Sequence, residues 1–215
     1  MTETSHRSDS IRALVERRDL TDPCQGENPM QALVDRLDVG DAGLVRRTLR
    51  TPPLVPAEDG WQPRHTTTET VLAALPDVLR DGTSSAVLRC AGLVCGGRQT
   101  GSSVLVGHQM DYWLFGQTGS QVLGDLVQRS MKAAIGKTPY RLLPADDALL
   151  GHGFRLDIAD EGHWVEVGRC GSLTYRHEVV AVGFRVMLEP LLAASDLETA
   201  DYAGGSTATV TSSRS

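Results

Sequence analysis

The stretch GHQMDYWLF at residues 107–115 decides the fold, because polar and apolar side chains alternate along it. Alternation with a period of two predicts a β-strand. Gln109 and Asp111 lie on the same face of that strand, where two acceptor groups can bracket an ammonium group. The stretch WVEVGRCG at residues 164–171 alternates in a similar way. We expect the two strands to line one pocket for a small ligand.

Elements of both kinds flank these two strands. Further strands are predicted at residues 86–95, 103–106 and 154–158. Helices are predicted at residues 10–18, 29–37, 68–79 and 122–135, with Asn28 as the cap of the second and Pro29 as its first residue. Residues 179–194 are predicted to pass from a strand or loop into a helix. Strands grouped centrally, with helices before, between and after them, predict an α+β fold in which helices flank an antiparallel sheet.

Length and composition restrict the domain organisation. The chain of 215 residues is long enough for one sizeable core, so we expect a single domain over residues 10–197. Residues 1–9 are polar, and residues 198–215 are rich in Ser, Thr, Gly and Ala. Both ends are therefore predicted to be disordered.

Charge and cysteine content exclude several classes of protein. A formal net charge of -6 argues against a dedicated nucleic-acid surface, which needs clustered Lys and Arg. The 4 cysteines show neither CxxC spacing nor the density of a disulfide scaffold, so we expect reduced thiols and no zinc site. The first residues lack an apolar signal region, and no apolar run is long enough to span a bilayer. A cytoplasmic protein outside the membrane is expected.

The order and spacing of several motifs resemble the catalytic core of phenylalanyl-tRNA synthetases, which are class II aminoacyl-tRNA synthetases. HQMD at residues 108–111 and WVEVGRCG at residues 164–171 resemble the HQxE and WxExxGCG strands of the amino-acid site. RHTTT at residues 64–68 is similar to the family's RTHTS segment, and PLVP at residues 53–56 lies where the class places its dimer-interface motif. DLTDPCQGENPMQ at residues 19–31 is similar to the entry helix of stand-alone members. Over about residues 19–195 the chain thus resembles a truncated, degenerate paralogue of the alpha-type core.

This resemblance implies a set of amino-acid-binding residues. Gln109 and Asp111 would hold the α-ammonium group, with Asp111 in place of a glutamate, and Thr68 would lie near the carboxylate. The floor of the pocket would be formed by Glu166, Gly168, Cys170 and Gly171. The family's aromatic wall is replaced by ALL at residues 148–150, with Leu149 at its centre, so we expect a ligand other than phenylalanine.

The departures from the family concern ATP. CGG at residues 95–97 stands where the family has an arginine that holds the α-phosphate, and Pro190 stands where an arginine stacks on adenine. Arg98 and Arg185 lie nearby in sequence and are the candidates for binding ATP, if ATP is used. Adenylyl transfer depends on fixed cations, whose loss costs orders of magnitude in rate. We therefore expect no conventional use of ATP with magnesium, and we assign no other cofactor or metal.

Simpler interpretations compete with these assignments. Without the resemblance, Gln109 and Asp111 would be read as a solvated strand face. His108 could be a structural histidine, or it could form a catalytic pair with Asp111. Cys170 is expected to be a small buried residue rather than a nucleophile, and His65 is a further acid–base candidate.

Three functions are consistent with these residues. The first is an enzyme of specialised metabolism that uses the retained pocket for condensation, cyclisation or acyl transfer on an amino-acid-like substrate. The second is a non-catalytic pseudo-synthetase that senses an amino acid or supports a partner enzyme. The third, an ATP-dependent amino-acid:tRNA ligase, is the weakest because the chain lacks both signature arginines and a recognisable tRNA-binding module. We favour the first and expect a homodimer.

Overall fold

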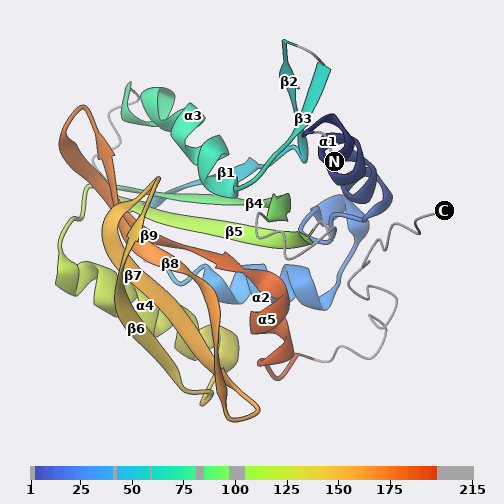
Figure 1. The fold of residues 1–215 in the computed structure, drawn as a ribbon. Helices are drawn as coiled ribbons and strands as arrows, with labels where there is room; N and C mark the ends of the chain where they lie inside the picture. Colours follow the sequence, from blue (N-terminus) through green and yellow to red (C-terminus); the bar gives the residue numbers. More distant parts are fainter. Residues whose placement is uncertain (1–2, 41–42, 59, 81–84, 97–104, 198–215) are drawn as a thin grey trace.

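One large β-sheet with helices on both faces forms the body of the protein (Figure 1). The computed structural model describes residues 3–40, 43–58, 60–80, 85–96 and 105–197. The strands are β1 (Val45–Arg50), β2 (Leu54–Ala57), β3 (Gly60–Pro63), β4 (Ala86–Gly96), β5 (Leu105–Phe115), β6 (Tyr140–Asp147), β7 (Gly151–Asp160), β8 (His163–Tyr175) and β9 (Glu178–Met187). The helices are α1 (Glu3–Glu16), α2 (Pro29–Leu37), α3 (Thr67–Arg80), α4 (Ser120–Ile135) and α5 (Leu188–Ala193), with a short 3-10 helix η1 (Pro23–Gln25).

The sheet has seven strands in the order β1-β4-β5-β9-β8-β7-β6. Neighbouring strands run antiparallel, except that β1 and β4 run parallel. Parallel strands need a crossover connection, which the β2–β3 hairpin and α3 supply here. The predicted α+β class with a large antiparallel sheet flanked by helices is confirmed.

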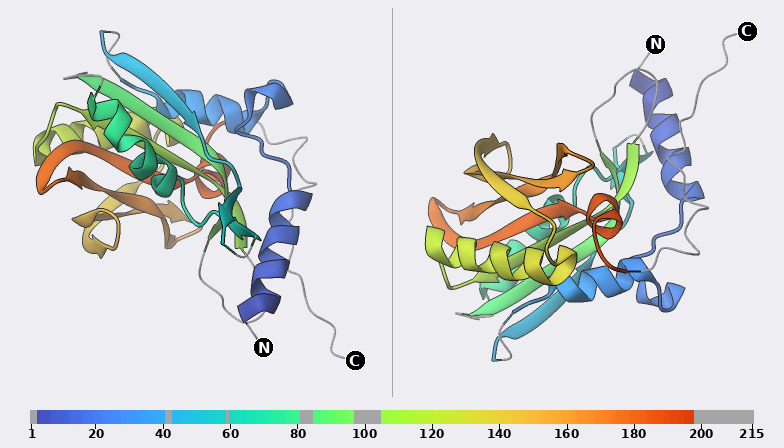
Figure 2. Two further views of the ribbon diagram at one scale, coloured as in Figure 1. Left: turned by 90° about the horizontal axis from the view of Figure 1, so that it is seen from above. Right: turned by 90° about the horizontal axis from the view of Figure 1, so that it is seen from below.

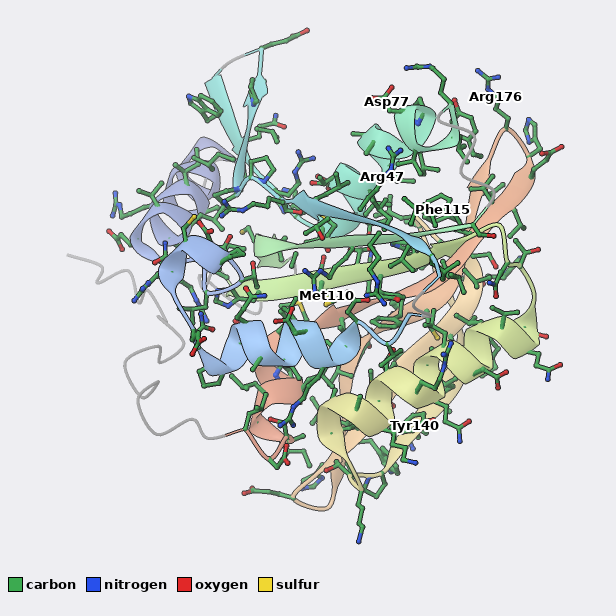
Figure 3. All side chains as sticks on the ribbon, turned by 180° about the vertical axis from the view of Figure 1, so that it is seen from behind. Arg47, Asp77, Met110, Phe115, Tyr140 and Arg176 are labelled. Atoms are coloured by element: carbon green, nitrogen blue, oxygen red, sulfur yellow. The ribbon has the colours of Figure 1, made fainter. Side chains whose placement is uncertain are left out.

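The sheet separates two hydrophobic clusters. Met110, Tyr112 and Leu114 of β5 belong to the larger cluster with residues of α2, α4 and α5, and Figure 3 shows Met110 between β5 and α2. Trp113 and Phe115 point the other way and pack with residues of α3. Figure 2 shows α3 over one face of the sheet and α2 and α4 over the other. β5 is therefore buried on both sides, and a polar residue on it needs partners inside the protein.

Most predicted helices lie where the sequence placed them. Asn28 Oδ1 accepts a hydrogen bond from Gln31 N at 2.9 Å and caps α2, which begins at Pro29 as predicted. The first helix differs, because α1 begins at Glu3 inside the segment expected to be disordered. Leu14 of α1 is buried against β4 and β5, and a helix anchored in this way gains one hydrogen bond for each residue added. Residues 1–2 and the tail at 198–215 lie outside the described residues.

The sequences of two strands, β1 and β6, do not predict a strand. β1 reads VRRTLR and lies at one edge of the sheet, where charged side chains are common because they discourage pairing with another chain. β6 lies at the other edge and contains Pro144, which an edge strand tolerates because one side of it needs no N–H donors. The segment at residues 53–56, which resembles a dimer-interface motif, overlaps β2 of a hairpin that projects from the body (Figure 1). Among the described residues, no helix combines the length and apolarity that crossing a bilayer requires.

Candidate functional site

The middle of β5 carries polar side chains toward α3. Gln109 and Asp111 are alternate residues and point to the same face as Trp113. Asp111 is 0% exposed and Gln109 is 8% exposed, so neither belongs to a solvated strand face. Their hydrogen-bonding partners must come from the protein or from a ligand.

Three consecutive threonines at the start of α3 bind these two side chains. Gln109 Oε1 accepts hydrogen bonds from Thr66 Oγ1 at 2.7 Å, Thr67 N at 2.8 Å and Thr67 Oγ1 at 3.0 Å. Asp111 Oδ1 accepts from Thr68 Oγ1 at 2.9 Å, and its Oδ2 accepts from Thr67 Oγ1. A hydroxyl group has one proton, so Thr67 can serve only one of its two acceptors at a time. Gln109 and Asp111 together can therefore accept one further hydrogen bond.

Asp111 is a buried carboxylate with a perturbed pKa. Burial raises its pKa to about 6, against the effect of the hydrogen bonds from Thr67 and Trp113 and of the positive charge of Arg185. Trp113 Nε1 donates to Asp111 Oδ1 at 2.8 Å. At neutral pH the group is mostly ionised, and a buried negative charge is favourable only beside donors or a cation.

Arg185 of β9 brings a positive charge next to Asp111. The two residues are direct cross-strand partners and share a face of the sheet. Arg185 Nη1 donates to Thr66 Oγ1 at 3.4 Å and to Thr68 Oγ1 at 3.2 Å, and Nη2 donates to Asp147 Oδ2 at 2.7 Å. The Arg185 side chain is 14% exposed. The threonines of α3 thus connect the carboxylate and the guanidinium in one polar network.

The turn between β6 and β7 holds Asp147 in place. Its Oδ1 accepts hydrogen bonds from Leu149 N at 2.9 Å and Leu150 N at 3.1 Å. Although burial opposes the effect, these N–H groups and Arg185 hold the pKa of Asp147 below its usual value. Leu150 is buried, whereas the Leu149 side chain expected at the pocket wall is 37% exposed. Leu149 therefore lies at the solvent edge of the site.

Glu166 and Gly171 lie on the same face of the sheet as Arg185. Glu166 Oε1 accepts a hydrogen bond from Arg169 Nε at 2.8 Å, and Arg169 is the cross-strand partner of Arg185. A bulge in the pairing of β7 with β8 lets Glu166 and Arg169 share a face although they are three residues apart. Gly171 pairs with Gly183 on that face. The Glu166 side chain is 44% exposed, so it lies at the rim of the site and not at its floor.

Gly168 and Cys170 differ from expectation because they alternate with Arg169 and lie on the opposite face. Cys170 belongs to the hydrophobic cluster under α2, α4 and α5, and burial raises its pKa to about 12. Its thiol is protonated and cannot touch a ligand on the α3 face. A Cβ at Gly168 would collide with the carbonyl oxygen of Arg185, so this glycine permits the close approach of β8 to β9.

The catalytic pair expected between His108 and Asp111 is not formed, because residues three apart on a strand point to opposite faces. His108 is 1% exposed and contacts Glu189 through Nδ1 at 2.8 Å. Its Nε2 accepts a hydrogen bond from Leu20 N at 2.9 Å, which places the ring proton on Nδ1. His108 thereby joins the segment after α1 to the start of α5, which is a structural role.

The two remaining candidates contribute less. His65 is exposed, and its Nδ1 lies 3.0 Å from the carbonyl oxygen of Cys95. Arg98, a candidate for binding ATP, lies outside the described residues. Thr66, Thr68 and Asp147 take three of the five N–H donors of Arg185, so a phosphate at this position would have to use the Nε–H or the second Nη2–H, or displace Asp147. In the part of the chain that the structure describes, no group of three or more His, Cys, Asp or Glu side chains could hold a metal ion.

Several residues of the network were not identified from the sequence. Thr66 and Thr67 stand beside the predicted Thr68, and the run of three hydroxyl residues before an apolar helix was the available signal. Asp147 and Glu189 reach Arg185 and His108 across 38 and 81 positions of the chain. Local patterns carry no information about pairing at such separations.

The fold is that of class II aminoacyl-tRNA synthetase catalytic domains. Two structures of pyrrolysyl-tRNA synthetase from Desulfitobacterium hafniense, one described as PylSc, each superpose with a TM-score of 0.59 at 14% sequence identity. Both matches cover 86% of this chain, and they cover 72% and 75% of the respective synthetase chains. No protein-family model and no curated protein matches the sequence. The resemblance to phenylalanyl-tRNA synthetases stays a prediction.

Proposed function

We propose that the protein binds an amino acid, or a carboxylate that resembles one, on the sheet face formed by Gln109, Asp111 and Arg185. The observation that carries the proposal is the direct pairing of a buried carboxylate with an arginine on neighbouring strands. An amino acid presents the complementary charges, an ammonium and a carboxylate. The likeness of the fold to pyrrolysyl-tRNA synthetases supports this choice of ligand class.

The network suggests how the ligand would be held. An ammonium group has three donors, and it would take the place of the Thr67 hydroxyl proton that Gln109 Oε1 and Asp111 Oδ2 now share. The ligand's carboxylate would accept a hydrogen bond from Arg185 Nε, which no contact among the described residues engages. Because Thr67 and Asp111 are both 0% exposed, binding would also require the residues around them to move apart.

Ligand binding is better supported than chemistry. The expected pair of His108 and Asp111 is not formed, and Cys170 faces away from the site with a raised pKa. These observations favour a pseudo-synthetase that senses an amino acid or supports a partner enzyme. Condensation, cyclisation or acyl transfer without conventional adenylation is the second candidate, favoured by the pKa of about 6 at Asp111, which suits a general base near neutral pH. Transfer to tRNA ranks third.

Isothermal titration of the purified protein with individual amino acids tests the proposal. At least one amino acid should bind, and Asp111→Asn should lower its affinity by roughly a hundredfold, as expected when a buried ion pair loses one charge. Asp125→Asn, at an exposed position on α4, is the matched control and should bind normally. If no amino acid binds to folded protein, or if Asp111→Asn binds as well as the control, the proposed function is wrong.

ATP–pyrophosphate exchange with the amino acid that binds separates the candidates. Exchange above background would show that the chain activates its ligand and would make the ATP-dependent ligase the preferred function. The absence of exchange in protein that binds the amino acid is the expected result.

A further inference from the structure

The register of four neighbouring strands places three arginines in line with Asp111. Asp111 of β5 pairs with Arg185 of β9. Arg185 pairs in turn with Arg169 of β8, and Arg169 pairs with Arg155 of β7. Direct cross-strand partners point to the same face, and neighbouring strands lie about 4.8 Å apart. Arg155, Arg169 and Arg185, here called the arginine row, therefore extend from Asp111 across the α3 face of the sheet.

Carboxylates offset part of this charge. Like charges on directly opposed residues destabilise a sheet, so a row of arginines needs negative partners. Arg185 bonds Asp147, Arg169 bonds Glu166, and Arg155 bonds Asp157. Arg141 of β6 takes a share of Asp157, with Nε and Nη2 each at 3.0 Å from Oδ2. Apart from Asp111, four arginines thus share three carboxylates in the described part of the chain.

The arginine row opens toward solvent as it leaves Asp111. The exposed fraction of the side chain rises from 14% at Arg185 to 26% at Arg169 and 36% at Arg155. Arg169 donates through Nε to Glu166 and through Nη1 to the carbonyl oxygen of Asp146, which leaves its Nη2 without an acceptor among the described residues. Arg185 Nε and Arg169 Nη2 thus offer free donors on two neighbouring residues of the arginine row.

The two sides of the arginine row differ. On one side Gly153, Gly171 and Gly183 are cross-strand partners, and Leu150 of the β6–β7 turn lies over Gly171. On the other side the partner of Arg169 is Glu166, whose side chain is 44% exposed. A ligand would thus enter past Glu166 and would compete with that carboxylate for Arg169.

We infer that the site selects an amino acid whose side chain ends in an anionic group, either a carboxylate or a phosphate monoester. The inference rests on the proposed function and adds the ligand's class to it. The ammonium group binds Asp111 and Gln109, the α-carboxylate binds Arg185, and the side-chain anion binds Arg169 in place of Glu166. Arg155, on the neighbouring strand β7, also stabilises the side-chain anion when that group is a phosphate monoester, the larger of the two.

Isothermal titration with two matched pairs tests this selectivity. Glutamate is compared with glutamine, and O-phosphoserine with serine, so that each pair differs by the charge at the end of the side chain. The anionic member of at least one pair should bind roughly tenfold tighter or more, as expected for a charge-assisted hydrogen bond to arginine. The pair with the larger ratio identifies carboxylate or phosphate as the ligand group. Equal affinities within both pairs, in protein that binds an amino acid, overturn the inference and leave the proposed function standing.

Two variants with opposite expectations assign the effect to the arginine row. Arg169→Gln should abolish the preference within the pair, whereas Arg80→Gln, at an exposed arginine of α3, should preserve it. Glu166→Gln removes the competing carboxylate and should tighten binding of the anionic member roughly threefold without changing the neutral one, since exposed ion pairs contribute little. Glu166 is exposed, so this variant tests the inference even if Arg169→Gln fails to fold. An unchanged or reduced preference in Glu166→Gln would overturn it.

Discussion

The buried carboxylate of Asp111 makes stability depend on pH in the direction opposite to that of a salt-bridged acid. Its pKa is raised from 3.8 to about 6, so the folded protein retains a proton that the unfolded chain releases. The free energy of unfolding should therefore be highest below about pH 4 for this group, fall as pH rises to about 6, and then level off. Asp111→Asn removes the dependence.

Urea unfolding of the wild type and of Asp111→Asn checks this expectation. The stability of the wild type relative to the variant should fall by up to about 3 kcal/mol between about pH 4 and about pH 7. Comparison with the variant cancels the contributions of Asp147 and Glu189, whose lowered pKa values act in the other direction. A difference that does not change over this interval would show that Asp111 titrates normally.

The same residue should make ligand affinity depend on pH. Below its pKa of about 6 Asp111 is neutral and no longer attracts an ammonium group. Affinity should fall roughly tenfold for each pH unit below that value, because one proton must leave for the ligand to bind. Titration calorimetry at several pH values measures the slope. A flat profile down to about pH 5 would argue that Asp111 does not hold the ammonium group.

For single residues, the sequence predicted which face of β5 each side chain occupies but not which residues it contacts. The period of two placed Gln109 and Asp111 on one face, and that prediction holds because alternation is a local property of a strand. The same rule places His108 and Asp111 on opposite faces of the strand and so excludes the expected catalytic pair. The cross-strand register that aligns Arg155 with Arg169 needs the folded sheet.

Glu189, at the start of α5, links the segment after α1 to β5 through hydrogen bonds. Glu189 accepts hydrogen bonds from His108 N at 2.8 Å and from Arg17 Nη2 at 3.0 Å, in addition to its contact with the His108 ring. Glu189→Gln keeps the shape but replaces one acceptor oxygen with a donor group. We expect a loss of about 1 kcal/mol in the free energy of unfolding, because hydrogen bonds to Arg17 and His108 weaken while the Glu189 side chain, 34% exposed, keeps access to water.

Urea unfolding of Glu189→Gln measures this loss, with Glu178→Gln as the control at an exposed position of β9. The control should match the wild type. If both variants unfold at the same urea concentration as the wild type, the contacts of Glu189 do not fasten the N-terminal segment.

The sequence predicted those helices and strands whose own residues favour that structure. α2 has a capping asparagine, a proline in its first turn and an apolar face, all of which are visible in the sequence. β1 and β6 owe their structure to pairing with β4 and β7, and their own residues are polar or include proline. Propensity cannot identify such strands because partners elsewhere in the chain stabilise them.

The molecule as a whole is predicted to be a homodimer. The motif-based expectation rests on residues 53–56, which overlap β2 of the projecting hairpin, and Trp61 in β3 is 57% exposed. Light scattering at micromolar concentration should give about 46 kDa, twice the chain mass of 23.1 kDa. Trp61→Glu should shift the mass toward that of one chain, because it would place a charge in the expected interface. A wild-type mass near 23.1 kDa would contradict the prediction.

The parallel pairing of β1 with β4 also determines the order in which a growing polypeptide can mature on the ribosome. Arg46 pairs with Val87, so β1 is synthesised well before the strand that it needs. The antiparallel neighbours β6, β7, β8 and β9 follow one another directly and can form hairpins as soon as each strand emerges. Until β4 has been translated, the nascent chain carries an unpaired strand with the charges of Arg46, Arg47 and Arg50. Those charges can keep it from associating with neighbouring nascent chains during that interval.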